Sequence, residues 1–148
     1  FGFSDVLTMF LALNASVELY KGGVVPLAEY AQRPYDRDIL VRVLVPKENA
    51  RFVYQSVRNS QTDFPVLTCA AAKLADGSIR AAIGARPGKA VLYTAAPEAG
   101  ETAEEFAARF AAEVKADIKT ESNLRGGAEY RRHLAGVLTK RAVCRLEG

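Results

Sequence analysis

The sequence predicts an α+β protein in which helices pack on one face of an antiparallel β-sheet. The first observation is a series of short apolar stretches between residues 17 and 93, which are separated by glycine-containing turns as in antiparallel hairpins. The second is the pattern of residues 102–142, where apolar side chains recur three and four positions apart, as in amphipathic helices. Because most strands precede these helices along the chain, the helices are expected to lie together against the sheet.

A short helix is predicted at the beginning of the chain, followed by a hairpin. Ser4 and Asp5 can accept hydrogen bonds from the free amides of a first helical turn, and the apolar run behind them ends near Asn14. Residues 17–20 and 24–27 flank a pair of glycines, which indicates two strands joined by a tight turn.

The next apolar stretch predicts a third strand and, after it, a domain junction. Residues 38–46 alternate branched apolar side chains and end at a proline, so we expect a largely buried strand. The polar segment 47–50 follows. It is the predicted boundary between two domains, residues 1–50 and 51–148.

The second predicted domain begins with strands. Asp76 and Gly77 mark a turn between two apolar runs, which should therefore form an antiparallel hairpin. The predicted strands are residues 51–58, 66–74, 78–85 and 89–93.

Two amphipathic helices complete the predicted fold. Thr102 and Glu105 have the spacing of a capping box, in which each side chain bonds to the backbone of the other residue. The apolar face of the first helix comprises Phe106, Ala107, Phe110, Ala111, Val114 and Ile118. The apolar face of the second comprises Tyr130, Leu134, Val137 and Leu138, and Arg141 falls on the same stripe.

The charges of these helical segments differ in sign, although the whole chain has a formal net charge of +3. Residues 101–121 contain six acidic and three basic residues, whereas residues 122–148 contain two acidic and six basic residues. We expect the two segments to compensate each other, so no nucleic-acid partner is expected. The alternative, nucleic-acid binding through the arginine-rich helix, would give an affinity that depends steeply on salt.

The composition is typical of a soluble globular protein, with 49% hydrophobic and 25% charged residues. No apolar run approaches the ~20 residues that cross a bilayer, so neither a membrane partner nor a targeting segment is expected. Cys69 and Cys144 lie far apart without metal-ligand spacing. Both are expected to stay reduced in a cytoplasmic protein, and no metal site is predicted.

No catalytic residue can be assigned from the sequence. His133 is the only histidine and has no clustered carboxylates beside it, while Glu129 is four residues away and predicts a surface pair. Neither glycine pair has the spacing of a phosphate-binding loop. His133 is therefore assigned a structural role.

Two long stretches together resemble a known family. Residues 58–90, RNSQTDFPVLTCAAAKLADGSIRAAIGARPGKA, and residues 123–142, NLRGGAEYRRHLAGVLTKRA, are similar to the C-terminal domain of the flavoprotein (FAD-binding, medium) subunit of molybdenum hydroxylases of the xanthine dehydrogenase and carbon monoxide dehydrogenase type. Residues 1–50 resemble the end of the FAD-binding domain that precedes it. The glycine-rich loops that hold the FAD pyrophosphate in this family would lie before Phe1.

The resemblance implies part of an oxidoreductase complex. In this family electrons pass from a molybdopterin centre through two [2Fe-2S] clusters to FAD, and from FAD to NAD or another acceptor. FAD would be the cofactor of the intact subunit, and the iron–sulfur and molybdopterin-binding subunits would be its partners. The fragment alone is expected to be inactive. The alternative is a non-catalytic protein-interaction module that docks a partner through its sheet face or last helix.

Three residues match positions that contact FAD in the family. Asp5 matches an acidic position that hydrogen-bonds FAD, and Ile39 and Leu40 match apolar positions that pack on the flavin ring. From the residues alone, Asp5 could instead cap a helix, and Ile39 and Leu40 could fill the core of the sheet. Several members have a lysine that approaches the flavin near the position of Tyr54, where this sequence has none, and this departure concerns the electron acceptor.

Overall fold

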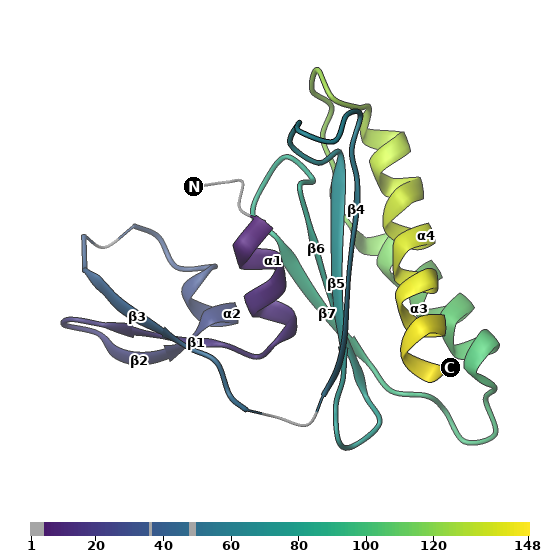
Figure 1. Cartoon of the computed structure of the whole chain (residues 1–148), viewed down its shortest axis with the longest axis horizontal. Helices are drawn as coiled ribbons and strands as arrows, with labels where there is room; N and C mark the ends of the chain where they lie inside the picture. Colours follow the sequence, from purple (N-terminus) through teal and green to yellow (C-terminus); the bar gives the residue numbers. More distant parts are fainter. Residues whose placement is uncertain (1–4, 36, 48–49) are drawn as a thin grey trace.

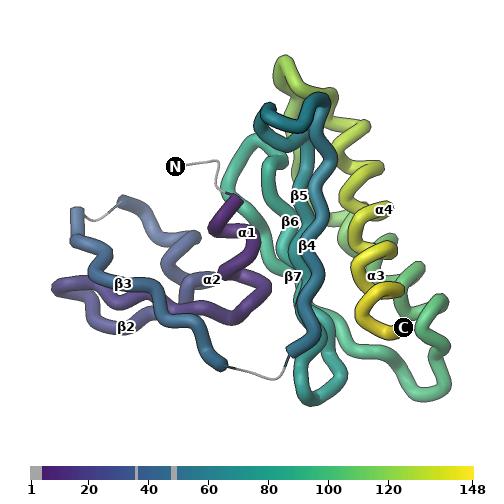
Figure 2. The backbone as a smooth tube through the Cα atoms, in the orientation of Figure 1, coloured from purple at the N-terminus to yellow at the C-terminus, as the bar shows by residue number. Residues whose placement is uncertain are grey.

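A computed structural model of the chain describes residues 5–35, 37–47 and 50–148 and confirms the predicted α+β fold (Figure 1). The strands form two antiparallel sheets, one with the order β2-β1-β3 and one with the order β4-β5-β6-β7. Helices α3 and α4 cover one face of the four-stranded sheet. The structure adds to the prediction that α1 packs against the opposite face, between this sheet and the three-stranded sheet (Figures 1 and 2).

The first part of the chain contains α1 and the three-stranded sheet. Its elements are α1 (Asp5–Ala12), β1 (Ser16–Leu19), β2 (Gly23–Pro26), α2 (Leu27–Tyr30) and β3 (Leu40–Leu44). The first helix and the hairpin are confirmed, and Gly23 has the positive φ of 65° that the turn requires. Ser4, one of the two predicted capping residues, lies outside the described residues. The short helix α2 was missed because four residues show no helical periodicity.

The prediction that the third strand is largely buried is wrong. Strand β3 pairs with β1 and forms an edge of its sheet, and its residues are mostly exposed. Ile39, just before it, is 66% exposed and Leu40 is 45% exposed. A run of branched apolar residues interrupted only by Arg42 is equally consistent with an interior strand and with an exposed edge strand.

The four-stranded sheet follows the predicted order. Its strands are β4 (Arg51–Val57), β5 (Leu67–Lys73), β6 (Ile79–Gly84) and β7 (Val91–Ala95). Each strand pairs antiparallel with the next, and Gly77 has a φ of 84° in the turn between β5 and β6. The predicted hairpin is therefore confirmed. Of the predicted junction, residues 48 and 49 lie outside the described residues.

The two faces of this sheet carry side chains of different size. Leu67, Ile79 and Ile83 point toward α3 and α4 and pack with Phe106 and Phe110 in the larger core. The opposite face carries small residues, among them Ala70 and Ala82, and packs against α1 in the second core. Large side chains fill the space under the helix pair, whereas small ones let the backbone of α1 approach the strands closely.

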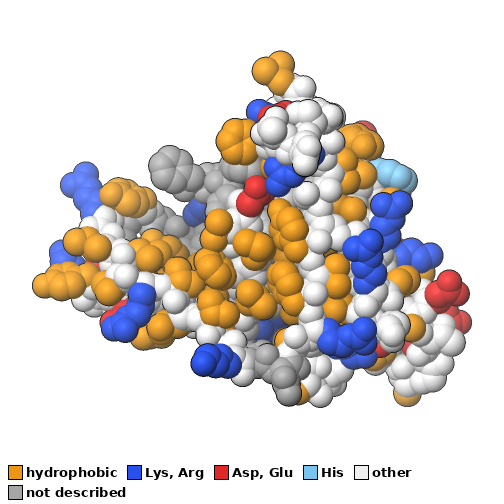
Figure 3. All heavy atoms as spheres, in the orientation of Figure 1, with side chains coloured by type: hydrophobic (Ala, Val, Ile, Leu, Met, Phe, Trp, Pro, Cys, Tyr) orange, Lys and Arg blue, Asp and Glu red, His pale blue; other side chains and the backbone are white. Residues whose placement is uncertain are grey.

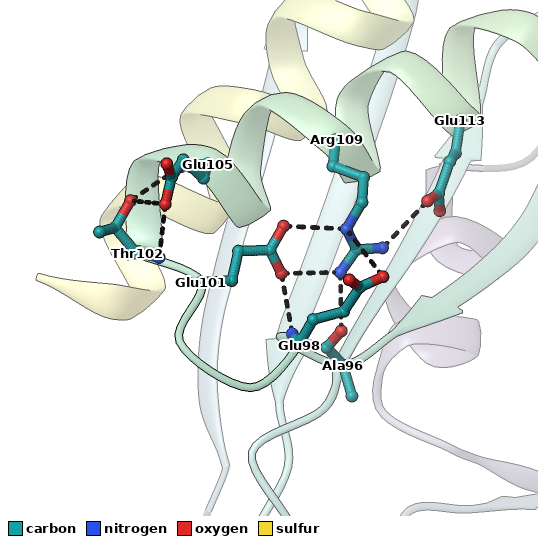
Figure 4. Close-up of polar contacts among 7 residues, drawn as sticks. All are labelled: Ala96, Glu98, Glu101, Thr102, Glu105, Arg109 and Glu113. Carbon is teal, nitrogen blue, oxygen red and sulfur yellow. Dashed lines mark hydrogen bonds and ion pairs between the residues drawn. The ribbon is translucent and has the colours of Figure 1, made fainter.

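Helix α3 (Ala103–Asp117) begins at the predicted capping box. Glu105 N donates to Thr102 Oγ1 at 3.3 Å, and Thr102 N donates to Glu105 Oε2 at 2.9 Å (Figure 4). The predicted apolar face of this helix is buried as expected. At the same end of the helix, Arg109 donates to Glu101 and Glu113 and to the carbonyl of Ala96.

Helix α4 (Ala128–Glu147) is longer than predicted, and its buried stripe is displaced. Leu134 and Leu138 are buried as expected, but Tyr130 is 49% exposed and Arg141 is exposed. The predicted stripe was therefore wrong at these two positions. Arg131 is fully buried instead. The buried residues are Arg131, Leu134, Ala135, Gly136, Leu138, Thr139, Ala142, Val143 and Leu146.

The expected charge compensation between the two helical segments is also corrected. Within the described residues, the ion pairs of α3 and the loop before it all converge on Arg109, which contacts Glu98, Glu101 and Glu113. Glu129 of α4 pairs with Arg132 rather than with His133. Glu147 of α4 pairs with Lys73 of β5, at 2.6 Å. Within the described residues, no ion pair joins α3 to α4.

The two cysteines do not form a disulfide with each other. Cys69 is buried and Cys144 is exposed, and both are free. Burial raises the pKa of the Cys69 thiol to about 12, although Thr139 opposes this shift by hydrogen bonding.

Among the described residues, no helix is both long enough and apolar enough to span a bilayer.

The close approach of α1 predicts that Gly84→Ala destabilises the fold. A Cβ atom at Gly84 would lie 2.0 Å from Thr8 Oγ1 and 2.6 Å from Thr68 Oγ1, so α1 would have to move away from the sheet. We expect a loss of about 1–3 kcal/mol in the free energy of unfolding, measured by urea denaturation. Gly136→Ala is the control because its Cβ would make an ordinary contact at 3.4 Å and alanine favours the helix. Equal stability of the two variants would contradict the packing described.

Candidate functional site

Asp5 lies at the first turn of α1, beside the end of β4. Its Oδ2 atom is 3.5 Å from Arg58 Nη2, and its side chain is 32% exposed. The other carboxylate oxygen, Oδ1, is buried, and none of the described residues donates a hydrogen bond to it. A buried carboxylate oxygen without a donor costs free energy, so this atom is suited to accept a hydrogen bond from a bound group.

Tyr54 of β4 belongs to the same cluster. It is half-buried against the core below α1. Burial raises the pKa of Tyr54, the nearby Asp5 charge raises it further, and Arg58 opposes the shift. Tyr54 is therefore held in its neutral form, as a hydroxyl next to a carboxylate and a guanidinium. Tyr54 therefore supplies a neutral hydrogen-bond donor and acceptor at this point of the cluster.

A second group of contacts connects the two stretches that carry the family resemblance. Arg58 Nη1 donates to the carbonyl of Asp63 at 2.6 Å, and Asp63 Oδ1 accepts from Arg125 at 2.9 and 3.0 Å. The Arg125 guanidinium lies over the ring of Phe64, 5.2 Å from its centroid. Hydrogen bonds from Arg125 and from the backbone of Phe64 hold the pKa of Asp63 below its ordinary value. These residues cross-link the loop after β4 to the loop before α4.

Arg131 fixes the second of these loops from inside. Its Nη2 donates to Asn123 Oδ1 at 2.6 Å and its Nη1 to the carbonyl of Glu121 at 3.2 Å. Burial and the neighbouring Arg125 lower the pKa of Arg131. The burial of this arginine was not predicted from the sequence, because charged residues are rarely buried without an acidic partner. The available signal was its position three residues before Leu134, on the buried side of the helix.

Ile39 and Leu40 form an exposed apolar surface at the start of β3, together with Val41, which is 49% exposed. Asp38 holds this segment in place. Its carboxylate accepts hydrogen bonds from the backbone amides of Lys21, Gly22 and Ile39, at 3.1, 2.8 and 2.7 Å. The alternative that Ile39 and Leu40 fill the core of the sheet is contradicted by their exposure.

The predicted site residues do not converge on one point in this chain. Asp5 contacts Arg58 at the end of β4, whereas the backbone carbonyl of Ile39 accepts from Tyr20 in the three-stranded sheet. Figure 1 shows the start of α1 and the start of β3 well separated. Within the described residues no cluster of three metal-ligating side chains occurs. Asp5 and the β3 surface therefore lie on two separate faces of the chain. Only a ligand or protein segment that extends between these faces could contact both.

Comparison with known proteins identifies the family to which this fold belongs. The CO dehydrogenase flavoprotein C-terminal domain family matches residues 52–146, which include both stretches that the Asp63–Arg125 contact joins. The chain therefore belongs to this family. No curated protein matches the chain.

Several solved structures share the fold of nearly the whole chain. Quinoline 2-oxidoreductase from Pseudomonas putida 86 has a TM-score of 0.75 and 18% sequence identity. The CO dehydrogenases from Oligotropha carboxidovorans and Hydrogenophaga pseudoflava have TM-scores of 0.77 and 0.76, at 20% and 22% identity. In each case 97% of this chain is covered but only 56% of the other, so this chain spans little more than half of the matched chains. At these identities the likeness shows the fold.

The pKa values of Tyr54 and Tyr93 should each depend on one neighbouring acidic residue. Removing the Asp5 charge by Asp5→Asn should lower the pKa of Tyr54, because that charge helps to raise it. Asp117→Asn should instead lower the pKa of Tyr93, whose hydroxyl donates to Asp117 Oδ2 at 3.0 Å. Both pKa values can be followed by NMR of ¹³C-labelled tyrosine. Each variant is the control for the other, and a Tyr54 pKa unchanged by Asp5→Asn would contradict the cluster.

The segment before β3 should be sensitive to acid. Burial opposes the shift, but backbone hydrogen bonds from Ile39, Lys21 and Gly22 hold the pKa of Asp38 below its ordinary value of 3.8. The contact is therefore intact above that pH and is lost as the pH falls through the lowered pKa. We expect the Gly22 and Ile39 amide ¹H shifts to titrate together below pH 3.8. In Asp38→Ala these amide shifts should show no such titration.

Proposed function

We propose that this chain is part of the FAD-binding subunit of a molybdenum hydroxylase. In the intact complex, the subunit would pass electrons from iron–sulfur clusters through FAD to NAD or another acceptor. The observation that carries the proposal is the family match over residues 52–146. Residues 51–148 would be the C-terminal domain, and residues 1–50 the last part of the FAD-binding domain.

The residues of the first part fit a flavin in two respects. Asp5 offers a buried carboxylate oxygen that has no donor among the described residues, and a hydroxyl or N–H group of FAD could donate to it. Ile39 and Leu40 offer exposed apolar side chains, on which a flat ring system could pack. When bound, FAD supplies the redox chemistry, and this chain would contribute position and environment.

In such a subunit Tyr54 would lie next to Asp5, and this bears on the electron acceptor. A neutral hydroxyl there would not add positive charge close to the flavin, as the family's lysine does. Lower positive charge disfavours a negatively charged reduced flavin. We therefore propose that the acceptor of this complex is matched to a flavin of lower potential than in members with the lysine.

The partners follow from the same proposal. The solved CO dehydrogenases that share the fold are described as containing molybdenum and copper, or as lacking the molybdopterin part of the cofactor. By analogy, this subunit would assemble with an iron–sulfur subunit and a molybdopterin-binding subunit in the cytoplasm. The molybdenum subunit would select the substrate.

Flavin uptake by the whole subunit tests the proposal. A chain that includes the preceding part of the subunit should bind FAD, measured by titration of the flavin absorbance after reconstitution. Asp5→Asn should weaken binding by about 10- to 150-fold, because a hydrogen bond to a charged group contributes ~1.5–3 kcal/mol. Ile39→Ser with Leu40→Ser should weaken it through lost apolar contact.

Val24→Ser is the matched control for the apolar variant. Val24 is 61% exposed on β2, in the same sheet, but it is not at a family flavin position. Its affinity for FAD should equal that of the unaltered subunit. No flavin uptake by the whole subunit would refute the proposal and leave the interaction-module alternative. Uptake that is insensitive to both site variants would refute the residue assignment only.

A further inference from the structure

A groove runs between α3 and α4 on the side that faces away from the four-stranded sheet. Its volume is about 360 Å³. The two helices are antiparallel, since the beginning of α4 lies against the end of α3. The groove is lined by Ala108, Ala111, Ala112 and Lys115 of α3 and by His133, Gly136, Val137, Lys140 and Arg141 of α4.

Small residues make the floor of this groove. Gly136 lies opposite α3, where an added Cβ would be 3.4 Å from Lys115 Cβ and 3.5 Å from the carbonyl of Ala111. Ala108 and Ala112 are exposed on the α3 side. Because these side chains are so short, the backbone of another helix could approach the floor closely.

The charged side chains that line the groove are all basic, namely Lys115, Lys140 and Arg141. Lys115 and His133 lie at one end and Lys140 and Arg141 at the other, and no acidic residue lines the groove. None of these four side chains forms an ion pair within the described part of the chain. Figure 3 shows basic side chains and the histidine gathered along α4.

The reason for this imbalance lies on the other side of α3. There Arg109 binds Glu101 at 2.9 Å and Glu113 at 3.0 Å, with Glu98 at 3.7 Å (Figure 4). A single arginine thus gathers three carboxylates of this segment away from the groove. The cations on the α4 side keep their charge uncompensated, which favours an acidic partner.

We propose that this groove docks an acidic amphipathic helix of a partner protein. His133 and Arg141 are eight residues apart on α4, about 12 Å along the axis. Acidic residues two turns apart on the partner helix would therefore reach both ends of the groove, with alanine or leucine side chains between them on the floor. A helix fits better than a compact ligand because the groove is open and charged at both ends. The inference does not depend on flavin binding.

The test uses a synthetic helical peptide. The peptide carries glutamate pairs seven residues apart with alanine and leucine between them on one face, and its control is a scrambled peptide of the same composition. We expect binding by fluorescence anisotropy, weaker at higher salt. NMR shift changes should map to Ala112, Gly136 and Val137. The scrambled peptide should bind at least about tenfold more weakly, since its charges and apolar face no longer match the groove.

Two variants of the chain distinguish docking from general charge attraction. Lys140→Glu should weaken binding by at least about tenfold, because like charges then face each other. Lys21→Glu is the matched control, since this exposed lysine lies in the distant β1–β2 turn and changes the net charge equally. Ala112→Trp should block the groove without changing its charge.

Three results would overturn the proposal. The first is equal weakening by Lys140→Glu and Lys21→Glu, and the second is equal binding of the scrambled peptide. The third is tighter binding of inorganic phosphate or of a DNA oligonucleotide than of the helical peptide. All variants change exposed side chains, so circular dichroism should show an unaltered fold.

Discussion

The packing of α1 on the four-stranded sheet is the contact on which the rest of the structure depends. It joins the two sheets into one body, because the second core contains Ala70 and Ala82 of the large sheet as well as Val17 and Leu19 of the small one. The contact is possible only where the strands carry small side chains, and Gly84 marks its closest point. The opposite face needs large side chains to fill the space below α3 and α4. The size of the side chains is therefore constrained on both faces of each central strand.

Much of this architecture could be read from the sequence, because hairpin turns and capping residues act locally. The turn at Gly77 and the capping box at Thr102 lie where the sequence placed them. The exposure of Ile39 could not be predicted in this way. Burial depends on which surface covers a strand, and no local pattern reports that.

The candidate site, like the fold, could be predicted only in part. The burial of Arg131 was not predicted, because a buried arginine bonded only to an amide and a carbonyl is an exception to the usual rule that buried charges are paired. The acidic and basic segments were expected to neutralise each other, yet Arg109 pairs with two carboxylates of its own segment, Glu101 and Glu113. The ion pairs that form depend on the directions in which side chains point around a helix. The summed charge of a segment gives no information on these directions. Asp5, by contrast, was singled out by resemblance, and its buried oxygen gives that choice a physical basis.

The position of α1 also affects the order in which contacts can form during synthesis of the chain. Its partners β5 and β6 end at residues 73 and 84, so α1 contacts segments that are synthesised after it. Closing such a long loop is entropically costly until the strands it joins have already paired. During synthesis on a ribosome, residues 5–30 would thus wait with their apolar side uncovered until the β5–β6 hairpin has emerged. That interval is when this chain is most exposed to wrong contacts or to capture by a chaperone.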